Sequence, residues 1–407
     1  MLETVKTYLR HTSWPIILAM VTLIVIGVSA IRVAEPELAR TQMAFAGVAM
    51  AVFVVMTLVP YQRLGRWAYP ICALSLGLLV LVFFLPDNKG SHRWIDLRVA
   101  KFQPSELAKI AYVIMLAWYL RFGDHYRRLI GLAVPFVLTL IPMMLVLKEP
   151  DLGTALLFLP TLYFMLFMAG ARLRHLLGIV AMGTVLIFVP VPQHARSHAE
   201  AVEAQTREAL AYWTHTDAAG EKVNWTAASL AAMEWHQIKR IDGWLRQNDP
   251  GVMRNRAYQV SLSKLRLGLG GWAGQGADPD SGGRFKMPED HTDFIFSVVG
   301  GEWGFLGAAA VLMLYGIIFL FGLEIATGTD DPFGRLLAVG VLALLFSQVT
   351  INIGVTMGLM PVTGMTLPFV SYGGSSLVVN CMALGLLVNV GQNDTISLAR
   401  RPFEHSD

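Results

Sequence analysis

Four titratable side chains stand close together, immediately before a long apolar run. Glu289, Asp290, His291 and Asp293 precede a hydrophobic stretch that continues to about Leu323. A carboxylate at the mouth of a membrane helix is costly to place there, so such a group is by default a candidate for function. Held where water meets lipid, it could act as a general base on a substrate at the same depth. Asp293 is the candidate base, and the alternative is a helix N-cap, a position that Asp favours.

The composition indicates a membrane protein. The chain has 407 residues, of which 55% are hydrophobic and 15% charged, and its mean hydropathy is +0.53. So few charged groups could not cover the surface of a soluble domain. The formal net charge of +3 is small, and we expect no nucleic-acid partner. Both cysteines, Cys72 and Cys381, lie inside apolar runs, where no disulfide is expected.

Apolar stretches long enough to cross a bilayer recur along the chain and predict an all-α polytopic membrane protein with about ten spans. The predicted spans are 14–31, 43–59, 67–85, 104–120, 129–147, 152–169, 173–191, 293–323, 333–360 and 367–390. The corresponding organisation is spans one to seven in 1–192, a large extracytoplasmic loop in 193–292, spans eight to ten in 293–395 and a tail in 396–407. The first run lacks a small-residue cleavage site and is expected to remain as an anchor.

The short loops set the expected orientation. With the N-terminus in the cytoplasm, the inner short loops carry more Lys and Arg than the outer ones. The positive-inside rule then places both termini in the cytoplasm. The large loop and Asp293 consequently lie on the outer face of the cytoplasmic (inner) membrane.

The second half of the large loop contains a predicted basic amphipathic helix. Apolar residues recur at helical spacing over 258–269, with Arg254, Arg256, Lys264 and Arg266 as basic residues on or beside it. Such a helix lies in the headgroup plane, either as a plain interfacial anchor or as part of a site for an anionic group. The glycine-rich stretch 268–276 permits close backbone approach. It is not a nucleotide loop, because no Walker lysine follows it.

Polar residues also interrupt the fourth span and the segment before it. Glu106 and Lys109 are three residues apart, on one helical face. They are either a structural ion pair within the membrane or part of a functional site. Arg93, Trp94 and Lys101 mix aromatic and basic groups at the outer interface. An aromatic belt accounts for the tryptophan, and the basic residues suit an anionic headgroup.

Two further segments are candidates for the walls of a site. Asp151 joins the fifth and sixth spans on the outer face, where it either caps the sixth helix or contributes to a site. The stretch 352–376 contains Ser371 and Tyr372 among several Pro and Gly residues. Irregular backbone at membrane depth is tolerated only where it is buried in protein or lines a cavity.

Four motifs together resemble the SEDS family of bacterial cell-wall proteins, the RodA/FtsW/SpoVE group. The matching segments are Phe102–Lys109 (FQPSE-x-x-K), Glu149–Thr154 (PDLGT), Pro288–Phe296 (PE-x-HTDFIF) and Asn352–Ser376, which ends in PF-x-SYGGSS. They occur in the family's order and cover nearly the whole chain.

The resemblance implies a peptidoglycan glycosyltransferase with ten spans. Such enzymes polymerise lipid II on the outer face and pair with a class B penicillin-binding protein, a transpeptidase that crosslinks the glycan. Asp293 matches the family's catalytic aspartate, and Glu106 and Lys109 match its membrane ion pair. The contexts of 148–154 and 93–96 favour the cell-elongation (RodA, elongasome) branch, which sets cell shape, whereas 356–360 and 366–368 favour the division (FtsW) branch. Of the two we favour RodA.

The chemistry agrees with the residues. A sugar hydroxyl must attack an anomeric carbon, and the diphosphate leaves without needing a proton, so one carboxylate base suffices. The expected supporting residues are Arg93, Trp94, Lys101, Glu106, Lys109, Asp151, Arg254, Arg256, Lys264, His291, Ser371 and Tyr372. No metal-ligand spacing is found, although a divalent cation, Mg²⁺ or Mn²⁺, on the diphosphate stays open. A lipid flippase and a non-catalytic scaffold for a synthase are the alternatives.

Overall fold

The computed structural model describes residues 12–85, 93–96, 101–123, 125–149, 151–188, 240, 243–249, 257–275 and 289–393. Within these ranges the chain is almost entirely helical. In the first half the helices are α2 (Trp14–Ala34), α3 (Pro36–Leu58), α4 (Tyr61–Arg66), α5 (Ala68–Val82), α6 (Pro104–Leu120), η1 (His125–Arg127), η2 (Ile130–Leu132), α7 (Ala133–Lys148), α8 (Leu152–Met168) and α9 (Leu173–Phe188). In the second half they are α14 (Tyr258–Gly270), α15 (Ile295–Gly328), α16 (Pro332–Thr356) and α17 (Gly374–Gln392).

A two-stranded antiparallel hairpin precedes α6, and the sequence patterns did not predict it. Its strands are β1 (Ile95–Asp96) and β2 (Lys101–Phe102), which pair Ile95 with Phe102 and Asp96 with Lys101. The fold class is nevertheless the predicted one, an all-α multi-span membrane protein.

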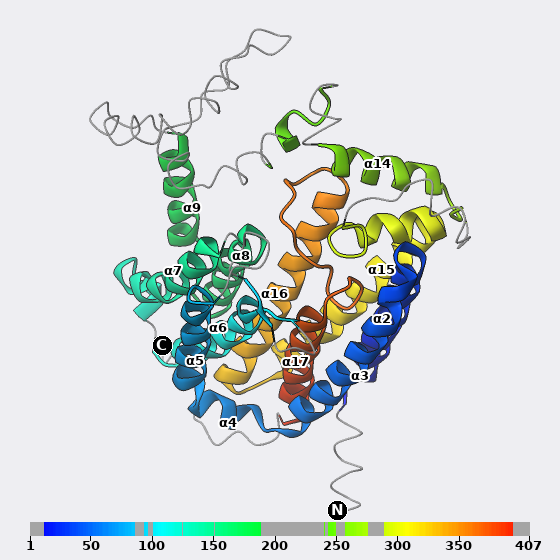
Figure 1. Ribbon diagram of the computed structural model, residues 1–407. Helices are drawn as coiled ribbons and strands as arrows, with labels where there is room; N and C mark the ends of the chain where they lie inside the picture. The colour runs from blue at the N-terminus through cyan, green and yellow to red at the C-terminus, as the bar shows by residue number, and fades with distance from the viewer. Residues whose placement is uncertain are drawn as a thin grey trace, which may run out of the picture.

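The bundle is built around α16 and α17. The best apolar windows of these two helices are 78% and 72% buried, whereas those of α3 and α15 are each 22% buried. Helices α2 and α3 lie on one side of this centre and α5–α9 on the other, and α14 lies across one end of the bundle (Figure 1). Helices α16 and α17 are thus enclosed by protein, and so is α6, which has no exposed residue. Helices such as α3 and α15 present apolar faces to the surroundings.

Every predicted span range contains a helix. Among the described helices, six are long and apolar enough to cross a membrane, and α5 and α8 are shorter apolar helices. The number of ten crossings therefore stays a prediction. Most of the predicted extracytoplasmic loop 193–292, with Arg254 and Arg256, lies outside the described residues.

The predicted start of the last span at Leu367 is wrong, because α17 begins only at Gly374. The chain between α16 and α17 is non-helical. Pro368 has no N–H to donate to a helix. Phe369 adopts a left-handed conformation with φ of 66°, which a helix cannot contain. The expectation of irregular backbone within 352–376 is confirmed for its central part.

Glycines join α14 to the first turns of α15. A Cβ on Gly270 would lie 1.9 Å from the carbonyl oxygen of Gly300, and one on Gly274 would lie 2.1 Å from that of Glu302. Opposite them, Gly304 kinks α15 with φ of 64° and ψ of −161°. Only glycine permits this backbone contact, which confirms the close approach predicted for 268–276 over the described residues.

Candidate functional site

The turn before α15 holds Asp293 in a fixed place. Glu289 takes a left-handed conformation with φ of 60°, which is uncommon for a residue with a side chain. Its carbonyl oxygen accepts hydrogen bonds from the backbone N–H groups of Thr292 and Asp293, both at 3.2 Å, and from the Thr292 hydroxyl at 3.0 Å. Strained residues of this kind persist where the surroundings over-determine them.

Three hydrogen bonds from other segments reach the carbonyl groups of this turn. The Asn352 amide donates to the carbonyl of Asp293 at 3.0 Å, and the Ser371 hydroxyl donates to that of Thr292 at 2.5 Å. The backbone N–H of Tyr372 donates to the carbonyl of His291 at 2.8 Å. The end of α16 and the loop before α17 thus fix the turn. Ser371 contacts the turn through its hydroxyl and Tyr372 through its backbone N–H.

The Asp293 carboxylate faces a cation. A Cβ added to Gly364 would lie 3.7 Å from Oδ2 of Asp293 and 3.4 Å from Nη1 of Arg240, so both side chains approach the same point of the chain. Burial raises the pKa of Asp293 to about 7, while the charge of Arg240 opposes the rise and that of Glu289 adds to it. Asp293 as a residue is partly accessible, although its carboxyl group is enclosed enough for burial to be the main cause of this rise. It is therefore a group that exchanges a proton near neutral pH, as a general base should.

Arg240 connects Asp293 to a second acidic position at the start of α8. Burial lowers the pKa of Arg240, and the nearby charges that act on it are those of Asp293, Arg93 and Asp151. Its Nη1 also donates to the carbonyl of Val362 at 3.4 Å. Two cations and two carboxylates from segments far apart in sequence therefore gather at this site.

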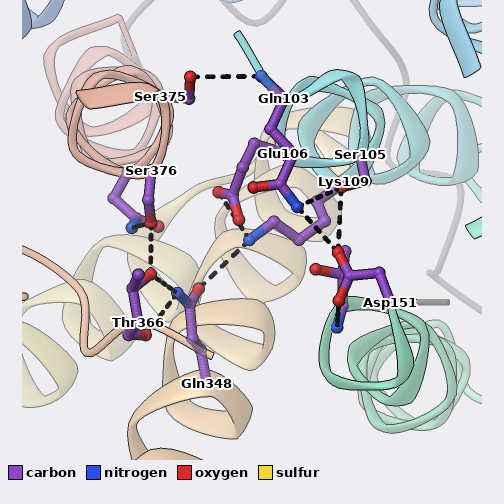
Figure 2. A network of polar contacts seen from close by, with 11 residues as sticks. Gln103, Ser105, Glu106, Lys109, Asp151, Gln348, Thr366, Ser375 and Ser376 are labelled. Atoms are coloured by element: carbon purple, nitrogen blue, oxygen red, sulfur yellow. Dashed lines mark hydrogen bonds and ion pairs between the residues drawn. The ribbon is translucent and has the colours of Figure 1, made fainter. Parts of the chain in front are cut away.

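Asp151 caps α8, one of the two roles predicted for it, and makes further contacts. Its Oδ1 accepts the backbone N–H of Thr154 at 3.1 Å, which caps α8. Its Oδ2 accepts hydrogen bonds from the Gln103 amide at 2.9 Å and the Ser105 hydroxyl at 3.2 Å (Figure 2). The cap thus also attaches α8 to the start of α6.

Glu149 lies behind this position and is fully buried. Neither of its carboxyl oxygens has a hydrogen-bond partner among the described residues. Burial raises its pKa to about 8, the Asp151 charge adds to the rise, and Arg93 opposes it. Arg93 Nε donates to the Glu149 backbone carbonyl at 2.7 Å, so this arginine joins the hairpin segment to the end of α7.

Glu106 and Lys109 form the predicted ion pair, with 2.9 Å between Oε2 and Nζ. Lys109 is 1% exposed and Glu106 5%. The Lys109 ammonium also lies 3.5 Å from Oε1 of Gln348, whose amide donates to the carbonyl of Thr366 at 2.9 Å. Figure 2 shows this chain of contacts continuing through Thr366 to Ser376, where the two hydroxyls are 2.7 Å apart. The pair therefore ties α6 to α16 and to the loop before α17.

Comparison with known proteins agrees with this architecture. A family model described as "Cell cycle protein", covering FtsW, RodA and SpoVE, matches residues 8–396. A protein of Geobacter metallireducens named "Probable peptidoglycan glycosyltransferase FtsW" is 34% identical over 357 residues, which cover 86% of this chain and 84% of the relative. "Stage V sporulation protein E" of Bacillus subtilis is 30% identical over 409 residues, 94% of this chain and 98% of the relative.

The chain belongs to the FtsW/RodA/SpoVE family.

Two solved structures of the same family are similar in fold. The crystal structure of Thermus thermophilus rod shape determining protein RodA has a TM-score of 0.64 at 27% identity, covering 95% of this chain and 98% of RodA. A chain from the work described as "Structural coordination of polymerization and crosslinking by a peptidoglycan synthase complex" has a TM-score of 0.72 at 28% identity, covering 94% of this chain and 98% of that one.

The branch of the FtsW/RodA/SpoVE family is not decided by these matches. "Peptidoglycan glycosyltransferase MrdB" of Escherichia coli is 33% identical over 344 residues, 84% of this chain and 82% of the relative. The FtsW relative is equally similar, at 34%. The preference for RodA stays a prediction.

The other predicted site residues have varied surroundings. Lys264 donates to Oε1 of Gln247 at 2.9 Å, at the joint between α14 and the end of α16. Lys101 is exposed, and its carbonyl accepts the Ser375 hydroxyl at 2.9 Å. Trp94 is 37% exposed. Nδ1 of His291 lies 3.6 Å from Asp290, and that contact raises the pKa of His291.

Sequence reasoning missed several members of the site. The patterns did not indicate Arg240 or Glu149, which lie close to Asp151. Nor did they indicate Gln348 or Asn352, whose amides donate to backbone carbonyls of Thr366 and Asp293. Gln348 and Asn352 are polar residues four apart in an apolar helix, and this spacing on one face was a usable signal. Arg240 stands in a loop with no periodicity, so nothing local marked it.

The side chains of the site do not form a metal-binding cluster among the described residues. Among the described residues, no three His, Cys, Asp or Glu side chains gather closely enough to hold an ion. A divalent cation on a substrate diphosphate therefore remains a hypothesis about the substrate.

Proposed function

We propose that this protein is a peptidoglycan glycosyltransferase that polymerises lipid II. The observation that carries the proposal is Asp293, a partly accessible residue whose carboxyl group has a pKa of about 7 and is held beside Arg240. The relatives named peptidoglycan glycosyltransferase support the reaction class. The motifs that suggested the family contribute the turn, the cap of α8 and the pair on α6.

In the proposed reaction the ionised Asp293 accepts the proton of a sugar hydroxyl on the acceptor. The hydroxyl oxygen forms a bond to the anomeric carbon of the donor, and the bond from that carbon to the diphosphate breaks. The electron pair departs with undecaprenyl diphosphate, which leaves as an anion without a proton. A positioned base typically contributes about 10²–10⁴ in rate. The remaining acceleration must come largely from electrostatic stabilisation of the departing diphosphate.

Arg240 and Arg93 are the proposed cations for that diphosphate. Arg240 interacts electrostatically with Asp293 and Asp151. Arg93 acts on the neighbouring Glu149 and on Arg240 itself. A guanidinium can bind a phosphate through two parallel hydrogen bonds. The charge of Arg240 also favours the ionised form of the Asp293 carboxyl group. Arg254, Arg256, Lys101 and Lys264 remain proposed as a wider basic surface.

The proposed setting is the outer face of the cytoplasmic membrane, with both termini inside. The excess of Lys and Arg in the predicted inner loops supports this orientation. A penicillin-binding protein of class B is the proposed partner, and one structural relative comes from a peptidoglycan synthase complex. We propose the elongation role on the sequence contexts of 93–96 and 148–154.

Purified protein given lipid II in detergent tests the reaction class. A polymerase makes glycan strands there, whereas a flippase has no membrane across which to act and a scaffold makes nothing. The expected result is polymer that a muramidase digests. Translocation of labelled lipid II across vesicles, with no polymer in detergent, would instead identify a flippase. The same assay with and without the partner protein measures how far activity depends on that partner.

A further inference from the structure

Arg266 on α14 is buried between two carboxylates. Its Nη1 lies 3.4 Å from Oδ2 of Asp290, and its Nη2 lies 3.1 Å from Oε1 of Glu302. The three residues are 5%, 2% and 5% exposed. The predicted basic amphipathic helix is thus confirmed as a helix, but Arg266 does not lie on a solvated face. It bridges the turn that carries Asp293 and the first half of α15.

His291 extends this cluster. Nδ1 of His291 lies 3.6 Å from Oδ1 of Asp290, and this contact raises the pKa of His291. The His291 ring is also packed edge-on against Tyr372, with 5.6 Å between centroids. A continuous series of contacts therefore runs from Glu302 on α15 through Arg266, Asp290 and His291.

Arg266 belongs to a closely packed pair of helices, α14 and α15. The stem of Arg266 lies over Gly301, where an added Cβ would be 2.7 Å from its Cγ. Next to it, Gly270 meets the backbone of Gly300. Since α14 and α15 are in backbone contact here, the guanidinium cannot follow the turn if the turn moves. It fixes Asp290 relative to the helix pair.

The stability contributed by such a cluster is not its main effect. Buried ion pairs often contribute no more than apolar side chains of similar volume. Their geometric effect is definite, because the guanidinium fork donates hydrogen bonds to carboxylates only in certain directions. Asp290 lies in the same turn as Asp293, whose other attachments are hydrogen bonds to the backbone.

We propose that Arg266 is a positioning residue for Asp293: through Asp290 it holds the 289–293 turn against α15, and so sets where the base meets the acceptor hydroxyl. This inference rests on the proposed glycosyltransferase function. A displacement of about 1 Å at a reacting group can lower the rate about a hundredfold, so the loss of the bridge should affect turnover more than substrate binding.

The test compares Arg266→Gln, Arg266→Lys and Asp290→Asn with the wild type. Arg246→Gln is the matched control, because Arg246 pairs with Asp249 at 2.6 Å in the same region but with side chains that are 30% and 37% exposed. Folded protein is quantified by size-exclusion chromatography. Lipid II polymerisation gives kcat and KM, and amide hydrogen exchange of the 289–293 peptide reports on the turn without depending on catalysis.

For Arg266→Gln we expect kcat per folded molecule to fall roughly tenfold to a hundredfold with KM changed less than about threefold. Amide exchange in the turn should become faster. Asp290→Asn, the milder change, should act in the same direction, Arg266→Lys should recover part of both effects, and Arg246→Gln should match the wild type.

Unchanged exchange in the turn for both Arg266→Gln and Asp290→Asn would overturn the proposal. So would a loss of activity that only follows the yield of folded protein. If the wild type makes no polymer, the proposed function fails, and the exchange data still decide whether Arg266 holds the turn.

Discussion

Two acidic groups in this protein, Asp293 and Glu106, stand at helix starts and have opposite surroundings. Glu106 is 5% exposed and lies 2.9 Å from the ammonium of Lys109, which also approaches Gln348. Asp293 is partly accessible, and its hydrogen bonds to α16 and the neighbouring loop are made by its backbone carbonyl and by those of its turn. Its carboxylate faces Arg240 across Gly364.

The difference distinguishes a structural carboxylate from one that can take part in a reaction. A carboxylate paired with a buried cation has a structural effect, because removing its partner leaves an uncompensated charge. A partly accessible acidic residue with a fixed backbone and a pKa near neutrality can exchange a proton in turnover. From this comparison we infer that the Glu106–Lys109 pair is structural, and we propose that Asp293 carries the reaction.

The largest expected effect is that of Asp293→Asn on turnover. Polymerisation should fall about 10²–10⁴-fold, because the amide cannot accept the proton. The folded-state pKa of about 7 lies above the ordinary 3.8, so ionisation of Asp293 opposes folding, and this cost appears as the pH rises from the lower value to the higher. At pH about 8 the thermal midpoint should therefore not decrease.

Asp331→Asn is the matched control for that experiment. Asp331 caps α16, accepting hydrogen bonds from the backbone N–H groups of Phe333 and Gly334, and Asn caps helices equally well. Both variants should fold alike and only the first should be inactive. Equal activity of the two variants would show that Asp293 is not the general base.

Lys109→Met is expected to affect stability rather than chemistry. It leaves the Glu106 carboxylate buried without its cation, which costs roughly 3–5 kcal/mol. The double variant Glu106→Gln/Lys109→Met should recover much of this loss in an unfolding titration. If the double variant unfolds as readily as the single one, the pair is not the structural element inferred here.

Arg240→Gln should have an intermediate effect on turnover. Loss of a cation beside the departing diphosphate is expected to lower kcat roughly tenfold or more. Because Arg240 lowers the pKa of Asp293, its removal should also shift the acid limb of the rate profile to higher pH. A reduced kcat with an unmoved limb would mean that Arg240 acts on substrate alone.

The smallest effect should come from Asp151. Asp151→Ala loses the cap on Thr154, worth about 1 kcal/mol, and leaves Gln103 and Ser105 without their acceptor. Asp151→Asn keeps the cap and should be nearly as stable as the wild type. A large loss of polymerisation in Asp151→Asn, with stability intact, would show that Asp151 takes part in the reaction and does not only stabilise the fold.

The sequence predicted the helices and the position of Asp293 because both depend on local patterns. Apolar runs mark helices, and a cluster of ionisable residues before one is visible without a fold. The ion pair on α6 was predictable because its spacing is local. Arg240 and Glu149 were not, since their roles come from contacts between distant segments. Arg266 was predicted only as one of the basic residues of an amphipathic helix, because helical periodicity does not show which polar side chain meets a buried acid.

The dependence of turnover on pH tests the central claim most directly. With lipid II well below its KM, kcat/KM of the wild type, which reports the pKa values of the free enzyme, is measured from about pH 5 to about pH 9, with folding checked at each end. A base must be ionised to act, so kcat/KM should rise with pH and level off above an apparent pKa near 7. Asp293→Asn should lack this limb in its residual activity. A wild-type profile that stays flat down to pH about 5, or a limb that persists in Asp293→Asn, would contradict the assignment of Asp293 as the base.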